Sequence, residues 1–229
     1  MMAGPLAPHV EPLRARLEAL LAEGKVEASE VRKRVTMLPQ AARTLADNVF
    51  ETVAAGTLKR RRIVIRYGAR STGESTERTI SPQRLVHYRD NWYVDAWCHL
   101  RNELRKFAVD AIADARLTEE RAKAVDLREV AREFNSGYGI FGGTKVHWAK
   151  LRFAPSRARW VAQERWHPDQ RGRAEADGSY VLEVPYTDSR ELMMDILKYG
   201  SEVEVLGPSS LVATVAGEIR RMAAALPRA

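Results

Sequence analysis

The sequence predicts an α+β chain in which helices come first and two sheet-containing parts follow. In the first 58 residues apolar side chains recur at three- and four-residue steps, which is the spacing of amphipathic helices. From Ile80 to Ile112 apolar and polar residues alternate, which is the spacing of half-buried strands. From residue 146 onward the patterns follow the order β-α-β-β-α-β, which is typical of a ferredoxin-like domain.

Three helices are expected before residue 59, at Val10–Ala22, within residues 27–37 and at Gln40–Leu58. A helix-turn-helix that binds DNA presents basic and polar residues on its last helix. The last helix here contains acidic residues and a single basic one, Arg43. We therefore interpret this segment as a helical connector and not as a DNA-reading domain.

Strands are expected next. The apolar run Ile63–Tyr67 predicts a first strand, and the polar turn Gly68–Glu77 leads into a second. The alternating stretch then reverses at a turn, Leu100–Glu103, which predicts a hairpin. A helix is expected from Leu117 to Phe134, where apolar residues again recur at helical spacing.

The hairpin has two faces, because side chains alternate along a strand. One face of its first strand carries Trp92, Val94, Ala96 and Cys98, and the other carries Tyr93, Asp95, Trp97 and His99. We expect the first face to enter the core, which leaves Tyr93 and His99 available to a ligand. The turn and the return strand add Arg101, Arg105, Lys106 and Phe107.

The chain is basic, with a formal net charge of +7. Between Lys59 and Phe107 there are twelve basic and five acidic residues, so this region accounts for the whole excess. A basic region interleaved with aromatic rings such as Tyr88 favours binding to a polyanion. A solvated basic face without a ligand is the alternative.

Cysteine usage and the N-terminus bound the cellular setting. The single cysteine, Cys98, excludes an internal disulfide and a cysteine-based zinc site. The first ten residues lack the basic start and apolar stretch of a signal peptide, and no run approaches ~18 apolar residues. We expect a reducing, cytoplasmic setting with no membrane partner.

A glycine-rich segment, NSGYGIFGGTK at residues 135–145, lacks the spacing of a phosphate-binding P-loop. We expect it to be a flexible linker between two domains. After it, Asp177-Gly178 is a strong hairpin signal, and Asp188 with Glu191 has the spacing of a capping box. The expected strands are residues 146–153, 171–176, 180–186 and 202–206, and the expected helices are residues 155–164, the segment from Asp188 to Gly200, and residues 208–226.

The hairpin region resembles the WYL domain. The resemblance rests on SPQRLV at residues 81–86, Tyr88, WYVDAWCHLR at residues 92–101, LRKF at residues 104–107, and Asp110 with Ile112. Val94 replaces the leucine of the Trp-Tyr-Leu triplet that names the domain, which exchanges one apolar residue for another.

Proteins with this domain are mostly bacterial transcription regulators, and the resemblance implies an architecture. It implies a connector and dimerisation segment at residues 1–58, a small SH3/Sm-like β-barrel with a following helix at residues 59–134, and a C-terminal extension at residues 146–229. It also implies a homodimer. A winged helix-turn-helix that would bind operator duplex DNA is not expected in this chain.

An enzyme is not expected. None of the five histidines lies in a metal-binding spacing, and the chain contains no G-x-S-x-G nucleophile motif. We therefore expect no catalytic residues, no metal and no cofactor.

The resulting hypothesis is an effector-sensing regulatory chain whose ligand is single-stranded DNA, as in a response to DNA damage. Arg101 and Arg105 would bind phosphates, and Tyr93 and Phe107 would stack on bases. The full predicted set is Ser81, Arg84, Tyr88, Tyr93, His99, Arg101, Arg105 and Phe107. Arg84 has two equal interpretations, a phosphate ligand or a partner of a core carboxylate such as Asp95 or Asp110.

Two alternatives remain open at this point. One is a sensor of a nucleotide or cyclic dinucleotide. The other is a dimerisation scaffold that binds no ligand.

Overall fold

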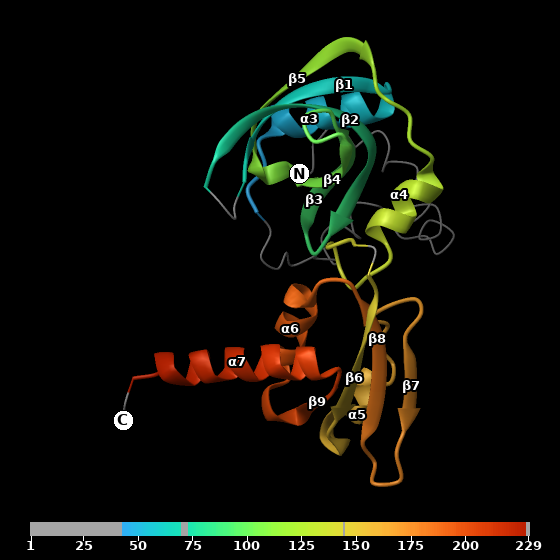
Figure 1. Ribbon diagram of the computed structural model, residues 1–229, viewed down its shortest axis with the longest axis vertical. Helices are drawn as coiled ribbons and strands as arrows, with labels where there is room; N and C mark the ends of the chain where they lie inside the picture. The colour runs from blue at the N-terminus through green and yellow to red at the C-terminus, as the bar shows by residue number, and fades with distance from the viewer. Residues whose placement is uncertain (1–42, 70–72, 144, 228–229) are drawn as a thin grey trace, which may run out of the picture. The chain divides into compact units, whose positions relative to one another are not determined.

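The computed structural model describes residues 43–69, 73–143 and 145–227. The helices expected at Val10–Ala22 and within residues 27–37 lie outside the described residues. Two compact units divide the chain, unit 1 at residues 1–130 and unit 2 at residues 131–229 (Figure 1). None of the helices in the described ranges is long and apolar enough to cross a membrane.

Unit 1 is built on an open antiparallel sheet with the strand order β4-β3-β2-β1-β5. Its described elements are α3 (Asp47–Leu58), β1 (Arg61–Gly68), β2 (Ser75–Tyr88), β3 (Asn91–Cys98), β4 (Glu103–Ala108), the 3-10 turn η1 (Val109–Ala111) and β5 (Ile112–Arg121). Within the described residues, the edge strands β4 and β5 do not pair with each other. The expected barrel is therefore not closed.

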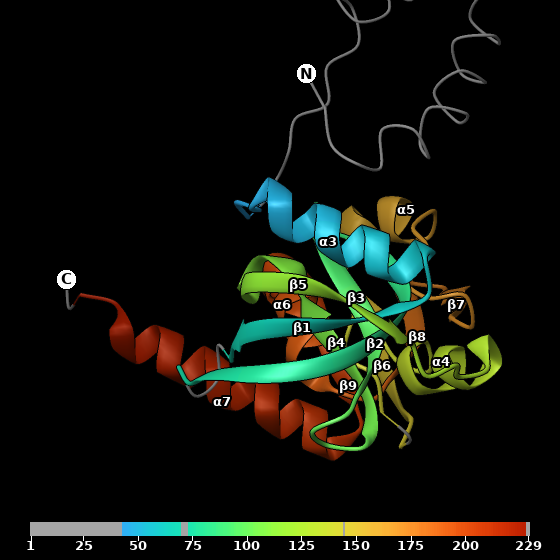
Figure 2. The same cartoon turned by 90° about the horizontal axis from the view of Figure 1, so that it is seen from above.

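The core of unit 1 lies between the sheet and helix α3, which crosses the sheet (Figure 2). Val49, Phe50 and Val53 lie on one face of α3, at positions i, i+1 and i+4, and are all buried. They pack in one cluster with Ile63 of β1 and Val94 of β3, which are fully buried. Burying a side chain of this size contributes about 1.5–3 kcal/mol, so this face of α3 holds the helix on the sheet.

The predicted apolar face of β3 is confirmed, because Val94, Ala96 and Cys98 are fully buried. Residues that pair directly across antiparallel strands point to the same face of a sheet. Val94 pairs with Leu85 of β2 and with Phe107 of β4, so these residues share the core-facing side. We call this side the inner face and the opposite side the outer face.

A β-bulge interrupts the pairing of β2 with β3. Pro82 pairs with Ala96 and Arg84 pairs with Asp95, so Gln83 is an extra residue on β2. Proline has no N–H to donate to a ladder, and a bulge is one of the places where a strand tolerates it. Because of the extra residue, both Ser81 and Arg84 point to the outer face although they are three residues apart.

Two predicted helices of this unit differ from the structure. The helix expected at Leu117–Phe134 is wrong in its first part, because β5 continues to Arg121 and helix α4 (Leu127–Phe134) begins later. Leu117 pairs with Ile63 of β1, so the sheet ladder prevails over the helical spacing. Helix α3 begins at Asp47, seven residues after the expected start. Arg43, which precedes it, donates its backbone N–H to Asn91.

Unit 2 has the predicted order β-α-β-β-α-β, followed by the expected last helix. Its sheet is antiparallel with the order β7-β8-β6-β9. The elements are β6 (His147–Phe153), α5 (Pro155–Val161), β7 (Arg171–Ala174), β8 (Tyr180–Tyr186), α6 (Ser189–Lys198), the 3-10 turn η2 (Gly200–Glu202), β9 (Val203–Gly207) and α7 (Ser209–Ala225). Side chains of α5, α6 and α7 share one core cluster with Leu151 of β6 and Leu182 of β8, so these helices cover one face of the sheet.

The turn and cap signals of unit 2 have mixed outcomes. Gly178 has a φ of 83°, as the predicted hairpin turn requires. Asp188 caps α6 by accepting the Arg190 N–H at 2.9 Å. Glu191, the other residue of the expected capping box, makes a contact outside the helix. Its carboxylate is buried and accepts the Ile140 N–H at 2.6 Å.

The glycine-rich segment is packed and hydrogen-bonded, so the flexible linker expected there is wrong. The Tyr138 hydroxyl donates to Asp195 at 2.8 Å, and the Thr187 hydroxyl donates to the Phe141 carbonyl at 2.8 Å. A Cβ added at Gly137 would collide with Thr187. Glycine serves here for close packing against unit 2.

Phe107 tests the assignment of inner and outer faces. Phe107→Ala is expected to lower the free energy of unfolding by about 3–5 kcal/mol, because the truncation leaves a cavity in the core. Arg105→Ala, two residues away on β4 and exposed, is the control and should change it by less than about 1 kcal/mol. Urea unfolding of the full chain measures both. Unchanged stability in Phe107→Ala would contradict its place in the core.

Candidate functional site

The outer face of β2, β3 and β4 gathers the polar side chains of unit 1 in cross-strand rows. Three rows follow from the strand register: Ser81, Trp97 and Leu104; Arg84, Asp95 and Lys106; and Val86, Tyr93 and Ala108. Residues in one row lie next to each other across the strands, with Cβ atoms about 4.5–5.5 Å apart. The side chains of one row can therefore contact one another directly.

The middle row is an ion cluster around Asp95, whose side chain is fully buried. Arg84 donates its Nε–H to Asp95 Oδ2 at 2.6 Å, and Lys106 Nζ lies 3.2 Å from Oδ1. The Lys106 contact is an ion pair without hydrogen-bond geometry, since Oδ1 has no hydrogen-bond partner among the described residues. Of the two interpretations of Arg84, the structure therefore shows the pairing with a core carboxylate.

The Tyr93 row is covered by a segment that precedes α3. Arg43 donates to the Tyr93 hydroxyl at 2.7 Å and to Asp110 Oδ1 at 3.0 Å. The Arg43 guanidinium also lies 5.6 Å from the centroid of the Tyr93 ring. Tyr93 is only 5% exposed. The expectation that its ring is free to stack on a base is therefore wrong.

At the other end of the outer face lies a group that we call the His99 cluster, formed by Ser81, Trp97, His99, Lys123, Arg60 and Arg62. Ser81 Oγ lies 2.8 Å from His99 Nε2 and accepts the Lys123 backbone N–H at 2.8 Å. The Lys123 ammonium lies 3.0 Å from the centroid of the Trp97 ring. Arg60 approaches the same place, with its guanidinium 3.4 Å from the Pro82 carbonyl.

His99 is held in its neutral form. Burial lowers its pKa below 6.5, and the nearby Arg62 and Lys123 lower it further, while Glu120 acts in the opposite direction. Which of Ser81 Oγ and His99 Nε2 donates in their hydrogen bond depends on the tautomer of the neutral ring, and Ser81 Oγ also accepts the Lys123 backbone N–H. The serine thereby links the histidine to the backbone of residue 123.

The bulged residue Gln83 completes the local network. Its Nε2 donates to the Ser81 carbonyl at 2.7 Å and to the Lys123 carbonyl at 2.8 Å. Its Oε1 accepts the Val125 N–H at 3.2 Å and lies 3.4 Å from Arg60 Nη2. Gln83 is only 5% exposed, so all of these partners are needed to satisfy its amide.

The eight predicted site residues do not share one face. Phe107 is 1% exposed and makes an edge-to-face contact with Tyr67, so it cannot stack on a base. Arg105 pairs across the strands with Ala96, on the inner-face side, and its guanidinium contacts Glu103 at 2.7 Å. Arg101 lies in the exposed turn after β3. The other five lie on or beside the outer face: Ser81, Arg84, Tyr88, Tyr93 and His99.

Several members of the His99 cluster were not predicted from the sequence. Trp97 was placed on the correct face but was given no role. Lys123 was hidden by the false helix at Leu117–Phe134, which would have directed residue 123 away from the sheet. Pro82 was the available signal for the bulge, because proline inside a central strand indicates an irregularity.

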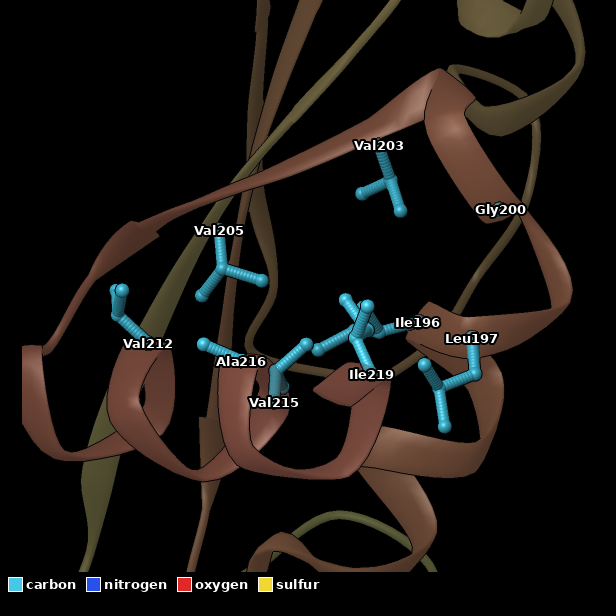
Figure 3. A pocket seen from close by; sticks show the side chains of 9 residues that line it. All are labelled: Ile196, Leu197, Gly200, Val203, Val205, Val212, Val215, Ala216 and Ile219. Carbon is cyan, nitrogen blue, oxygen red and sulfur yellow. The ribbon is translucent and has the colours of Figure 1, made fainter. Parts of the chain in front are cut away.

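Other parts of the chain offer less chemistry. The described residues contain no group of three or more His, Cys, Asp or Glu side chains that could hold a metal. Unit 2 contains a cavity of about 180 Å³ between α6, β9 and α7 (Figure 3). Its lining is apolar, with Ile196, Val205 and Ile219 among the residues that point into it. It has no side chain that could bind a phosphate.

The pKa of His99 predicts how stability depends on pH. Because folding lowers this pKa, the unfolded chain binds the proton more readily, and the free energy of unfolding should fall as the pH drops below about 6.5. His99→Gln should lose less stability than the wild type between neutral pH and the acid side of that value. Urea unfolding at the two pH values measures this. Exposed His87→Gln is the control, and an equal loss in all three proteins would contradict the expectation.

The Asp95 cluster predicts a large asymmetry between two carboxylates. Asp95→Ala removes a buried anion from between two cations and should lower the free energy of unfolding by about 3–5 kcal/mol. Glu103→Ala breaks an exposed pair and should cost less than about 1 kcal/mol. Thermal and urea unfolding of both variants test this. Similar losses for the two variants would show that Asp95 does not hold the middle row together.

Two protein-family models match the chain. The WYL domain matches residues 48–117, and the WCX domain matches residues 145–223. The first contains α3, the strands β1 to β4 and the start of β5. The second contains the sheet of unit 2 and most of α7.

Several characterised proteins are similar to this chain. Protein PafC of Mycobacterium tuberculosis is 31% identical over 164 residues, which cover 71% of this chain and 50% of PafC. The DNA-binding transcriptional repressor CapW of Escherichia coli is 31% identical over 84 residues, which cover 37% of this chain and 28% of CapW. The chain thus spans about half the length of PafC.

Two solved structures also align. Proteasome accessory factor B/C (PafBC) of Arthrobacter aurescens has a TM-score of 0.35 and 21% identity, over 79% of this chain and 28% of that chain. A CRISPR Cas-related protein has a TM-score of 0.48 and 12% identity, over 78% of this chain and 50% of that chain. Taken with the matches to the WYL and WCX models, the sequence similarity shows that this chain belongs to the WYL-domain family and carries a WCX domain after its WYL domain.

Proposed function

We propose that this chain is the effector-binding part of a transcription regulator and that its effector is single-stranded DNA bound at the His99 cluster. One observation carries the proposal. Cationic side chains from the turn after α3 and from β1, Arg60 and Arg62, lie beside two aromatic rings, Trp97 and His99, at the end of the outer face. Cations next to stacking rings are the usual components of sites that bind single strands.

Each part of the cluster has a role in this proposal. Arg60 and Arg62 bind backbone phosphates, since their guanidinium groups match phosphate geometry. Arg62 is paired with exposed Glu120, and such an exposed pair is weak enough to be exchanged for a phosphate. Trp97 stacks on a base, which contributes about 1–3 kcal/mol. His99 supplies a hydrogen bond, and the buried Ser81 positions the His99 ring.

The predicted residues outside the cluster take other roles. Arg101, exposed in the turn after His99, extends the cationic surface towards the strand. Arg84 and Tyr93 are positioning residues, because each is engaged by a partner within the protein. Arg105 and Phe107 drop out of the proposed site.

The regulatory output of the proposal rests on the family. CapW is named a DNA-binding transcriptional repressor, so we propose that binding of the effector alters how a homodimer binds operator duplex DNA through a winged helix-turn-helix. We also propose that the strand orders of units 1 and 2 are variants of an SH3/Sm-like barrel and of a ferredoxin-like sheet.

Binding of fluorescent oligothymidylates to the full chain tests the proposal. Affinity should fall steeply with salt, and removal of one phosphate contact should reduce the slope of log K against log salt by about 0.7. Arg60→Ala and Arg62→Ala should each show that reduction. Arg105→Ala is the control, since it lies on the other face of β4, and it should bind like the wild type.

Three outcomes are distinguishable in the same titrations. Salt-dependent binding that Arg60→Ala weakens supports single-stranded DNA. No oligonucleotide binding, together with a rise in melting temperature on adding a cyclic dinucleotide, would favour the small-molecule sensor instead. No response to either ligand would leave the chain as a dimerisation scaffold and would overturn the proposal.

A further inference from the structure

The chain leaves unit 1 through residues 122–126, which we call the exit segment. It joins β5 to α4 and has no regular secondary structure. Two side chains of β2 satisfy its backbone. Ser81 Oγ accepts the Lys123 N–H at 2.8 Å, Gln83 Nε2 donates to the Lys123 carbonyl at 2.8 Å, and Gln83 Oε1 accepts the Val125 N–H at 3.2 Å.

Both side chains that bond the exit segment are buried in unit 1. Ser81 is 0% exposed and Gln83 is 5% exposed, so the anchors are fixed in the core of the sheet. Lys123, Ala124 and Asp126 are themselves exposed. A stretch with few buried contacts that is held by a handful of hydrogen bonds opens at low free energy. A small change at Ser81 or Gln83 of β2 therefore acts directly on the backbone of the exit segment.

Lys123, which is anchored through its backbone, also covers the Trp97 ring on which the proposed base stacks. The Lys123 ammonium lies 3.0 Å from the Trp97 ring centroid. Among the described residues, no ring–ring contact is found for Trp97, and the Lys123 ammonium is its cation–π partner. A base that stacks on this face of the indole must take the position of the ammonium. Stacking of a base on an aromatic ring is generally stronger than an exposed cation–π contact.

We propose that Lys123 is a built-in competitor of the effector, and that displacing it from Trp97 releases the exit segment. This inference rests on the proposed function, since the displacing ligand is single-stranded DNA. Lys123 is held by three contacts: its ammonium lies on the Trp97 ring, its N–H donates to Ser81 Oγ, and its carbonyl accepts from Gln83 Nε2. Loss of the first contact leaves only the two hydrogen bonds to hold this residue in place.

The sign of the effect separates this inference from simple electrostatics. If Lys123 were one more cation for the phosphates, its removal would weaken binding. As a competitor, its removal frees the Trp97 ring, so Lys123→Ala should bind an oligothymidylate about 3–10-fold more tightly than the wild type, equivalent to a free-energy change of about 0.7–1.4 kcal/mol. Arg121→Ala removes the same charge from an exposed position nearby on β5 and should bind no more tightly than the wild type.

Hydrogen exchange of the full chain supplies the second measurement. In the wild type, a saturating oligothymidylate should speed exchange at the amides of Lys123 and Val125. In Lys123→Ala these amides should already exchange faster without the oligonucleotide. An unchanged melting temperature of Lys123→Ala shows that the variant is folded, as its exposed side chain leads us to expect.

Each combination of results either overturns or supports the inference. If neither the wild type nor Lys123→Ala binds oligothymidylates, the proposed function is overturned and the inference with it. If the wild type binds but Lys123→Ala binds equally or more weakly, only the competitor role of Lys123 is overturned. Slower exchange of the exit segment upon binding would likewise exclude its release. Tighter binding together with faster exchange supports the inference.

Discussion

The β-bulge at Gln83 is the constraint on which the candidate site depends. Side chains in a regular strand alternate between faces, so Ser81 and Arg84 would point in opposite directions without an extra residue between them. The bulge places both on the outer face, in register with Trp97 and Asp95. It also frees Gln83 from pairing with β3, and its amide therefore bonds the exit segment. One inserted residue thus forms the surface and connects it to the chain that leaves unit 1.

The buried carboxylate of Asp95 determines where the positive charge of the region is available. The sequence places an excess of seven positive charges between residues 59 and 107, but it does not say how they are distributed. Asp95 engages Arg84 and Lys106, and Glu103 engages Arg105. Arg60 and Arg62 remain at the end of the outer face. The acidic residue found there is the exposed Glu120, which pairs with Arg62. Arg84, Lys106 and Arg105 are therefore engaged by acidic residues of the protein, whereas Arg60 and Arg62 lie next to Trp97 and His99.

Features that depend on the spacing of neighbouring residues in the sequence were predicted correctly. The alternation in β3 correctly identified the buried side chains of Val94, Ala96 and Cys98, and the order of elements in unit 2 followed from its spacing. Features that depend on long-range pairing were missed. Whether Phe107 faces in or out depends on the register between β3 and β4, which the turn residues alone did not reveal. The burial of Tyr93 depends on Arg43, which is fifty residues away. The strand β5 exists because β1 supplies its ladder, and no window of sequence contains both.

The segments on either side of the boundary between the two units are both held by side chains. Before the boundary, Ser81 and Gln83 bond residues 123 and 125. After it, Glu191, Asp195 and Thr187 bond residues 138–141, and glycines allow the backbone to approach closely. Helix α4 lies between these two anchored stretches in the chain. The two anchored stretches differ in burial, because residues 136–143 are partly or fully buried whereas the exit segment is largely exposed. A perturbation of the connection is therefore expected to begin at the exit segment, on the side of the connection that carries the His99 cluster.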